Sequence, residues 1–78
     1  MRKITVVGAG VMGGGLAQLF AQKGNRVGLC DVSGEALDRA LQRARSNLEI
    51  QVEMGWIAPE EVEEALARIE SGSDLARA

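Results

Sequence analysis

Two short apolar runs and a glycine-rich segment between them dominate the first part of the chain. The first run, Ile4 to Val7, is rich in β-branched residues and ends abruptly at a glycine. Because apolar and polar residues do not alternate regularly in it, we expect a strand buried on both faces, as parallel sheets require. The second run, Arg26 to Cys30, ends at Asp31 and predicts another strand.

Between these runs the apolar residues recur at helical spacing. They predict a helix that begins near Met12 or Gly13 and stops at Gly24, a residue suited to a left-handed cap. Its apolar positions are Leu16, Leu19 and Phe20. A strand, a glycine-rich turn, a helix and a strand within about 30 residues form a βαβ unit, whose crossover should be right-handed.

The rest of the chain predicts two helices in succession. The first runs from Glu35 to about Met54, with Ser33 as N-cap and Gly55 as its end. Its apolar positions are Leu37, Leu41, Ala44, Leu48 and Val52. Pro59 suits the first turn of the second helix, although Ala58 before it is a poor cap. The apolar positions of that helix are Val62, Ala65, Leu66 and Ile69.

The end of the chain has no clear element. Ser71 to Asp74 has the composition of a turn, and the final residues are the place where a third strand would start. The sequence stops before it shows one.

Composition narrows the classes of function. With 78 residues and 46% hydrophobic residues, the chain is one small globular domain or part of a larger one. A net charge of −2 and few aromatic residues give no reason to expect nucleic-acid binding. The sequence contains no run of 18 apolar residues, so it predicts no membrane span. Arg2 and Lys3 precede an apolar stretch, but glycines interrupt it, so we do not predict a secretory leader.

Cysteine and histidine usage adds two further limits. Cys30 is the only cysteine, so no internal disulfide can form, and we expect a reducing cytoplasm. Since Cys30 lies in an apolar run, we interpret it as a small core residue and not as a nucleophile. The chain has no histidine, which removes the commonest general base and the commonest metal ligand, and we predict no metal site.

The glycine-rich segment has the pattern G-x-G-x-x-G. Preceded by a strand and followed by a helix, this pattern predicts a dinucleotide-binding turn. Gly8 permits the tight turn, Gly10 lets the backbone approach a diphosphate, and Gly13 lets the helix pack against the strands. The alternative is a plain strand-to-helix turn, for which one or two glycines would suffice. The predicted cofactor-binding residues of the turn are Gly8, Ala9, Gly10, Val11, Met12 and Gly13.

Asp31 completes the pattern at the carboxyl end of the second strand. There its carboxylate can accept hydrogen bonds from the adenosine ribose, and its charge would repel a 2′-phosphate. Val32 and Ser33 supply no arginine for such a phosphate, so we predict NAD and not NADP. The alternative is that Asp31 serves only as a turn or cap residue.

The chain resembles the start of the 3-hydroxyacyl-CoA dehydrogenases, and the bacterial 3-hydroxybutyryl-CoA dehydrogenases most. The resemblance rests on V-V-G-A-G-V-M-G-G-G-L-A-Q-L-F-A-Q-K-G, on L-C-D-V-S, on the two-helix segment with A-P-E-E-V and on S-G-S-D-L. It implies an NAD-dependent oxidation of the 3-hydroxyl of an acyl-CoA to the 3-ketone. It also implies that the catalytic histidine and glutamate lie beyond Ala78, so that no catalytic residue is expected in this chain.

The resemblance also suggests contacts to the acyl-CoA substrate from the paired helices. Asn47 falls where the family has a small polar residue that touches the CoA. The alternative is that Asn47 is only a polar residue on the solvent-exposed face of its helix. Met54 falls where a lysine is often found, and a methionine cannot pair with a phosphate.

Together these observations predict an α/β fold: a Rossmann-type parallel sheet with a βαβ unit and an inserted two-helix segment, truncated before a fourth strand. Residues 1–78 would form part of an NAD-binding domain, without the catalytic and dimerisation domain. The outer edge of Ile4 to Val7 would then be unpaired, so we expect a homo-oligomer or pairing with further chain. A freestanding NAD-binding or regulatory module, a flavin-binding domain and a dehydrogenase of another hydroxy acid remain the alternatives.

Overall fold

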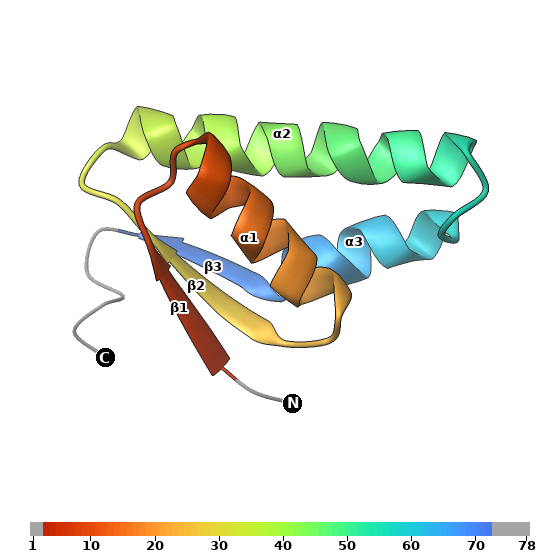
Figure 1. Cartoon of the computed structure of the whole chain (residues 1–78), viewed down its shortest axis with the longest axis horizontal. Helices are drawn as coiled ribbons and strands as arrows, with labels where there is room; N and C mark the ends of the chain where they lie inside the picture. Colours follow the sequence, from red (N-terminus) through yellow and green to blue (C-terminus); the bar gives the residue numbers. More distant parts are fainter. Residues whose placement is uncertain (1–2, 73–78) are drawn as a thin grey trace.

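The computed structural model describes residues 3–72, which form a three-stranded parallel sheet and three helices (Figure 1). The sheet order is β1-β2-β3, with Ile4 opposite Val27 and Val27 opposite Ile69. The predicted α/β fold with a βαβ unit and two inserted helices is confirmed. In chain order the elements are β1 (Lys3–Val7), α1 (Val11–Gln22), β2 (Arg26–Cys30), α2 (Gly34–Glu53), α3 (Pro59–Ala67) and β3 (Ile69–Gly72).

The helices lie on one face of the sheet, as Figure 1 shows for α1 and α2. Helix α1 packs on β1 and β2, and α2 and α3 each contact α1 and β3. The opposite face of β1 is open: Thr5 is exposed and Val7 is 72% exposed. The expectation that Ile4 to Val7 is buried on both faces is therefore wrong for this chain, because no helix within residues 3–72 covers the second face.

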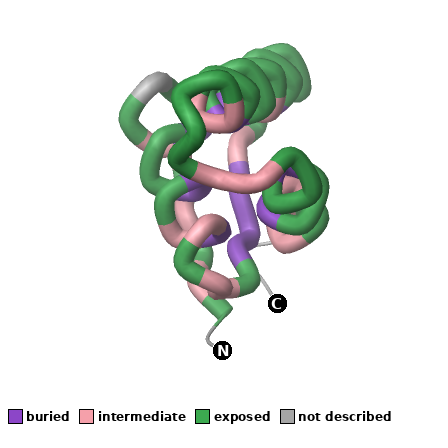
Figure 2. The backbone as a smooth tube through the Cα atoms, turned by 90° about the vertical axis from the view of Figure 1, so that its right-hand side faces the viewer, coloured by how far each residue is buried: buried purple, intermediate pink, exposed green. Residues whose placement is uncertain are grey.

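Small side chains build the core between the sheet and the helices. Ala17 and Ala21 of α1 are buried against β2. The buried residues of β2 are drawn in purple in Figure 2. Helix α1 also approaches α2 closely, since a methyl group on Gly14 would lie 3.1 Å from the Cβ of Ala40. Leu48 of α2 is fully buried. With almost no aromatic residue in the chain, close approach of small residues takes the place of large side chains in filling the core.

Most predicted element ends are confirmed. Helix α1 begins at Val11, slightly before the predicted start, and Gly24 follows it with a φ of +93°. Ser33 caps α2, since its Oγ accepts a hydrogen bond from the Ala36 amide at 3.2 Å. Pro59 starts α3, and Ala58 offers no side-chain cap, as expected. Cys30 is buried, with 6% of its surface exposed.

The prediction of a turn at Ser71 is wrong. Ile69–Gly72 forms β3, which pairs in parallel with β2, so Ile69 belongs to this strand and not to the preceding helix. Helix α3 ends earlier because Arg68 is held from both sides: its carbonyl accepts from the Val27 amide, and its guanidinium donates to the carbonyl of Ala21, both at 2.8 Å. Asp74 and the final residues lie outside the described part of the chain.

Candidate functional site

The glycine-rich turn connects the carboxyl end of β1 to the first turn of α1. Gly8 adopts a φ of +97°, a backbone conformation that residues with a Cβ rarely take. Its amide donates to the carbonyl of Cys30 at 2.7 Å, which continues the pairing between β1 and β2 past the last strand residue. Gly8 therefore needs to be a glycine for the fold itself.

Gly13 is also required by packing. A methyl group at this position would overlap the carbonyl oxygen of Gly8 and approach the side chain of Val6. The helix can thus lie directly on the turn and on β1 only because Gly13 has no side chain. The role predicted for Gly13, close packing of helix and strand, agrees with this geometry.

Gly10 differs from both, because nothing in the fold demands a glycine there. Its φ is −68°, which any residue adopts, and it is exposed. Among residues 3–72, no atom lies within 4 Å of a methyl group built on it. Gly10 is the N-cap of α1 and has no side chain to satisfy the first amides of the helix. The first amides of a helix have no carbonyl acceptor within it, and they lie at the positive end of its dipole.

Asp31 lies beside this turn, one residue after the end of β2. Its Oδ2 accepts a hydrogen bond from the amide of Ala9 at 2.8 Å, and its Oδ1 accepts from the amide of Ser33 at 2.8 Å. The hydrogen bond from Ala9, followed by that from Ser33, holds the pKa of the Asp31 carboxyl below its ordinary value. The carboxylate is therefore ionised at neutral pH at the rim of the turn.

The other predicted residues of the turn occupy distinct positions. Ala9 is buried with 1% of its surface exposed, so it can offer a ligand little more than backbone atoms. Val11 begins α1. Met12 is 81% exposed, and Val32, next to Asp31, is 95% exposed. The structure thus gathers the predicted turn and Asp31 at one edge of the sheet, with two apolar side chains beside them.

Sequence reasoning did not foresee the hydrogen bond between Ala9 and Asp31, which are 22 positions apart. The signal was present, because adjacent parallel strands end at the same edge of a sheet. The residues that follow β1 and β2 are therefore neighbours, and an acid after one strand can reach an amide after the other.

Asn47 lies apart from the turn, on the flank of α2 that faces the middle of α1. Its Nδ2 donates to the Oε1 of Gln18 at 3.2 Å. Gln18, which is 8% exposed, donates in turn to Gln22, and Gln22 and Gln51 donate to each other. We call these four residues the amide ladder. The structure does not bring Asn47 to the glycine turn, and its observed partner belongs to the ladder.

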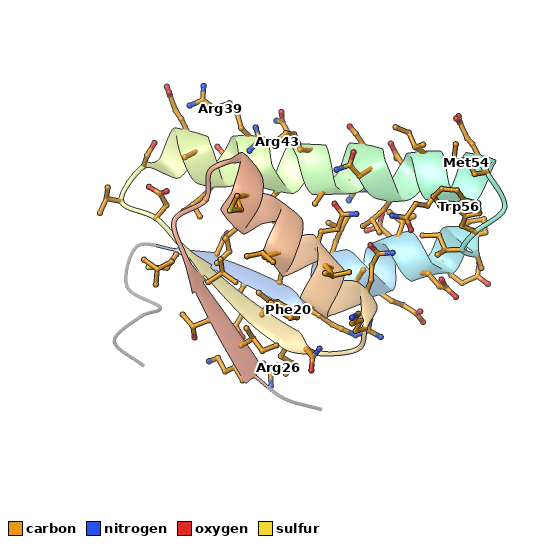
Figure 3. The ribbon with its side chains drawn as sticks, in the orientation of Figure 1. Phe20, Arg26, Arg39, Arg43, Met54 and Trp56 are labelled. Carbon is orange, nitrogen blue, oxygen red and sulfur yellow. The ribbon has the colours of Figure 1, made fainter. Side chains whose placement is uncertain are left out.

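Met54 is the C-cap of α2, at the far end of the helical pair. It is 57% exposed, and Trp56, two residues further on, is 69% exposed; both are labelled in Figure 3. The position where the family resemblance suggests a lysine therefore carries an exposed apolar side chain.

None of the helices in residues 3–72 combines the length and the hydropathy needed to cross a bilayer. Over that range, no three acidic or cysteine side chains converge as ligands of a metal ion.

A parallel βαβ unit with a glycine-rich turn at a helix start, beside an acid that ends the second strand, defines a Rossmann-type dinucleotide-binding unit. Comparison with protein families agrees. Residues 3–78 match the model described as 3-hydroxyacyl-CoA dehydrogenase, NAD binding domain. The chain therefore belongs to the 3-hydroxyacyl-CoA dehydrogenase family, and it corresponds to the NAD-binding domain of that family.

Individual relatives give the same result. A 3-hydroxyadipyl-CoA dehydrogenase of Escherichia coli is 35% identical over 96% of the chain, and a fatty acid oxidation complex subunit alpha of Psychrobacter cryohalolentis is 38% identical over 88%. The crystal structure of a 3-hydroxybutyryl-CoA dehydrogenase from Escherichia coli matches 97% of the chain with a TM-score of 0.90 and 34% identity. The chain spans only 16% and 10% of the length of the two curated relatives, and 16% of that crystal structure's chain.

Proposed function

We propose that this chain is the NAD-binding part of an enzyme that oxidises the 3-hydroxyl of an acyl-CoA to the 3-ketone. NAD, when bound, accepts the hydride that such an oxidation releases. The residues of this chain supply binding and orientation: the turn from Gly8 to Gly13 would hold the diphosphate, and Asp31 the adenosine ribose. No residue of the chain is proposed to take the substrate proton. The related dehydrogenases, whose names specify acyl-CoA substrates, support the assignment of substrate class.

The observation that carries the binding site is the contrast between Gly10 and the other two glycines of the motif. Gly8 and Gly13 are explained by the fold alone, through a positive φ and a close contact. Gly10 is explained by neither, and the space beside it is open. Gly34 is also open, but the hydroxyl of Ser33 caps its helix, whereas Gly10 is itself the N-cap and leaves the first amides of α1 without a side-chain partner. An uncapped positive end of a helix fits a position kept bare for an anionic ligand.

The substitution Gly10→Ala tests this proposal. The fold has room for the methyl group, so we expect the fold to be kept, with a small drop in melting temperature because alanine is less favourable than glycine at an N-cap. The methyl group would occupy the space of the diphosphate at an overpacking cost of about 1–3 kcal/mol. We therefore expect NAD to bind about tenfold to a hundredfold more weakly by calorimetry.

Gly34→Ala is the matched control, because Gly34 is another open glycine at a helix start. It should raise stability by about 0.5–1 kcal/mol through the alanine preference of helices and leave NAD affinity unchanged. If Gly10→Ala binds NAD as tightly as the parent chain, the diphosphate does not lie at this turn.

Asp31 underlies the proposed preference for NAD over NADP. An ionised carboxylate at this place would repel a 2′-phosphate, and the neighbouring Val32 is apolar. Calorimetry with NAD, NADP and FAD should give the tightest binding for NAD. Tighter binding of NADP would contradict the role of Asp31, and tighter binding of FAD would contradict the assignment of the cofactor.

For the acyl-CoA contacts, the observed geometry supports different interpretations of Asn47 and Met54. Asn47 uses its amide nitrogen in the amide ladder, which favours a packing role, and its contact to CoA remains a prediction. Met54 supplies no charge for a phosphate, so we propose that this chain makes no ion pair with the CoA from that position. We also propose a cytoplasmic location, in keeping with the single buried thiol of Cys30.

A further inference from the structure

We infer that Asp31 is a positioning residue for the diphosphate turn as well as an acceptor for the ribose, because its carboxylate fixes the turn before any ligand binds. This inference rests on the proposed function in one respect, the location of the diphosphate at the turn. The hydrogen bonds that carry it join residues of this chain to one another.

The first step of the argument is the position of the Ala9 amide. Ala9 stands between Gly8, which has a positive φ, and Gly10, whose backbone is extended at ψ −173°. Both neighbours are glycines, so the backbone around Ala9 has more freedom than any other stretch of the turn. The Gly8 amide already donates to the Cys30 carbonyl at the end of β2, and the 2.8 Å hydrogen bond from the Ala9 amide to Asp31 Oδ2 extends this attachment by one residue into the turn.

The second step is the other oxygen of the same carboxylate. Oδ1 accepts from the amide of Ser33, which is also the N-cap residue of α2. One carboxylate thus joins the turn before α1 to the turn before α2. We call this pair of hydrogen bonds the Asp31 clasp. Ser33 is itself tied to the first turn of α2, because its Oγ accepts a hydrogen bond from the Ala36 amide.

The third step is chemical. Both side-chain oxygens of Asp31 have to act as acceptors in the clasp, since both partners are backbone N–H donors. An asparagine has one oxygen and one NH₂ group, so it can accept from Ala9 or from Ser33 but meets the other donor with a donor. Asp31→Asn therefore keeps the size of the side chain and breaks one half of the clasp.

The consequence concerns diphosphate binding. If the clasp fixes the turn, its loss leaves the amides that face the diphosphate less well ordered, and binding has to order them. The charge of Asp31 acts in the opposite direction, because removing a carboxylate near an anion should strengthen its binding. Inorganic pyrophosphate has no ribose, so its affinity separates these two effects from the ribose contact.

The experiment compares the parent chain with Asp31→Asn and with Asp38→Asn. Asp38 is an exposed residue of α2, and its substitution removes the same charge without touching the clasp. Amide exchange at Ala9 and Ser33 is followed by NMR without ligand, circular dichroism verifies the fold of each variant, and calorimetry gives the affinities for pyrophosphate and NAD.

We expect Asp31→Asn to accelerate amide exchange at Ala9 or Ser33 by about tenfold, as for the loss of a hydrogen bond to a charged group. Pyrophosphate should bind to it several-fold more weakly than to the parent chain, and NAD should lose more than pyrophosphate because it also loses the ribose contact. Asp38→Asn should leave amide exchange unchanged and should not weaken pyrophosphate binding.

Equal or tighter pyrophosphate binding by Asp31→Asn would overturn the inference, whatever the exchange rates, because the carboxylate would then act on the diphosphate only through its charge. Unchanged exchange at both amides would overturn it too, since the clasp would not order the turn. If the parent chain binds NAD but not pyrophosphate, the positioning role fails and the proposed function stands. If it binds neither, the proposed function fails, together with the claim about the diphosphate.

Discussion

The glycines of the turn show that one residue type can serve different physical needs within a few positions. Gly8 provides a backbone conformation, Gly13 provides the absence of a side chain against Gly8, and Gly10 provides open space at the start of α1. A sequence pattern alone treats these residues as equivalent. Their separate roles follow only when the local φ and the neighbouring atoms are known.

At Gly13 we expect a loss of stability, in contrast to Gly10. In Gly13→Ala the new methyl group would overlap the carbonyl oxygen of Gly8, so α1 or the turn has to move. Overpacking of this kind costs about 1–3 kcal/mol. Since 1 kcal/mol shifts the melting temperature of a domain of this size by about 4–8 °C, thermal denaturation should detect it readily.

Gly14→Ala provides a comparison on the same helix. Its methyl group would lie 3.1 Å from the Cβ of Ala40, a tight contact that a small shift of α2 could relieve. We expect a smaller loss of stability than for Gly13→Ala. A melting temperature of Gly13→Ala equal to that of the parent chain would show that the turn yields easily.

At the scale of elements, local signals were sufficient for α1, β2 and α2. Their ends are marked by residues whose effect is local: Gly24 and Gly55 with their positive φ, and the Ser33 cap. Strand β3 could not be predicted in this way. Its sequence, Ile-Glu-Ser-Gly, has little strand character, and it becomes a strand because β2 offers it a partner far away along the chain.

The same distinction applies to the candidate site. The motif and the acid at the end of β2 could be predicted because both are local patterns with a known mechanism. The Asp31 clasp and the amide ladder depend on which residues meet across elements. No periodicity of a single helix indicates that Gln22 and Gln51 face each other.

The amide ladder gives a prediction about how α1 and α2 stay in register. In Gln51→Ala, Gln22 loses a partner with which it exchanges hydrogen bonds of 2.8 and 3.4 Å. Partly buried hydrogen bonds of this kind contribute about 0.5–1.5 kcal/mol, so chemical denaturation should show a loss of about 1 kcal/mol.

Gln42→Ala is the matched control, since Gln42 lies exposed on the same helix. It removes the same side chain at no cost in packing, and alanine's helix preference should raise stability slightly. Equal effects of the two substitutions would mean that the ladder does not hold α2 against α1.

At the scale of the whole molecule, the sheet is the least protected part. Within residues 3–72, β1 pairs only with β2, and its open face exposes Thr5 and Val7. An unpaired strand edge next to an exposed apolar residue favours association with further polypeptide. We propose that in the working protein this edge and face are covered, either by more of the same chain or by a second copy.

Analytical ultracentrifugation of the 78-residue chain tests that proposal. We expect self-association that increases with concentration, together with a marginal thermal stability, because small domains bury a limited share of their surface. Val7→Lys should reduce the association, since a charge on the open face opposes burial there. A compact and stable monomer at all concentrations would contradict the proposal.

The position of the two-helix segment between β2 and β3 has a consequence for chain entropy. Ile4 pairs with Val27 across one helix, whereas Val27 pairs with Ile69 across two, which nearly doubles the length of chain to be closed. Loop-closure entropy grows only with the logarithm of that length, so the longer connection adds about 0.6 kcal/mol. Burying a single leucine such as Leu48, at about 1.5–3 kcal/mol, offsets that penalty several times over. A sheet of this kind can therefore accept a long excursion between neighbouring strands, provided that the excursion brings its own apolar face back to the sheet.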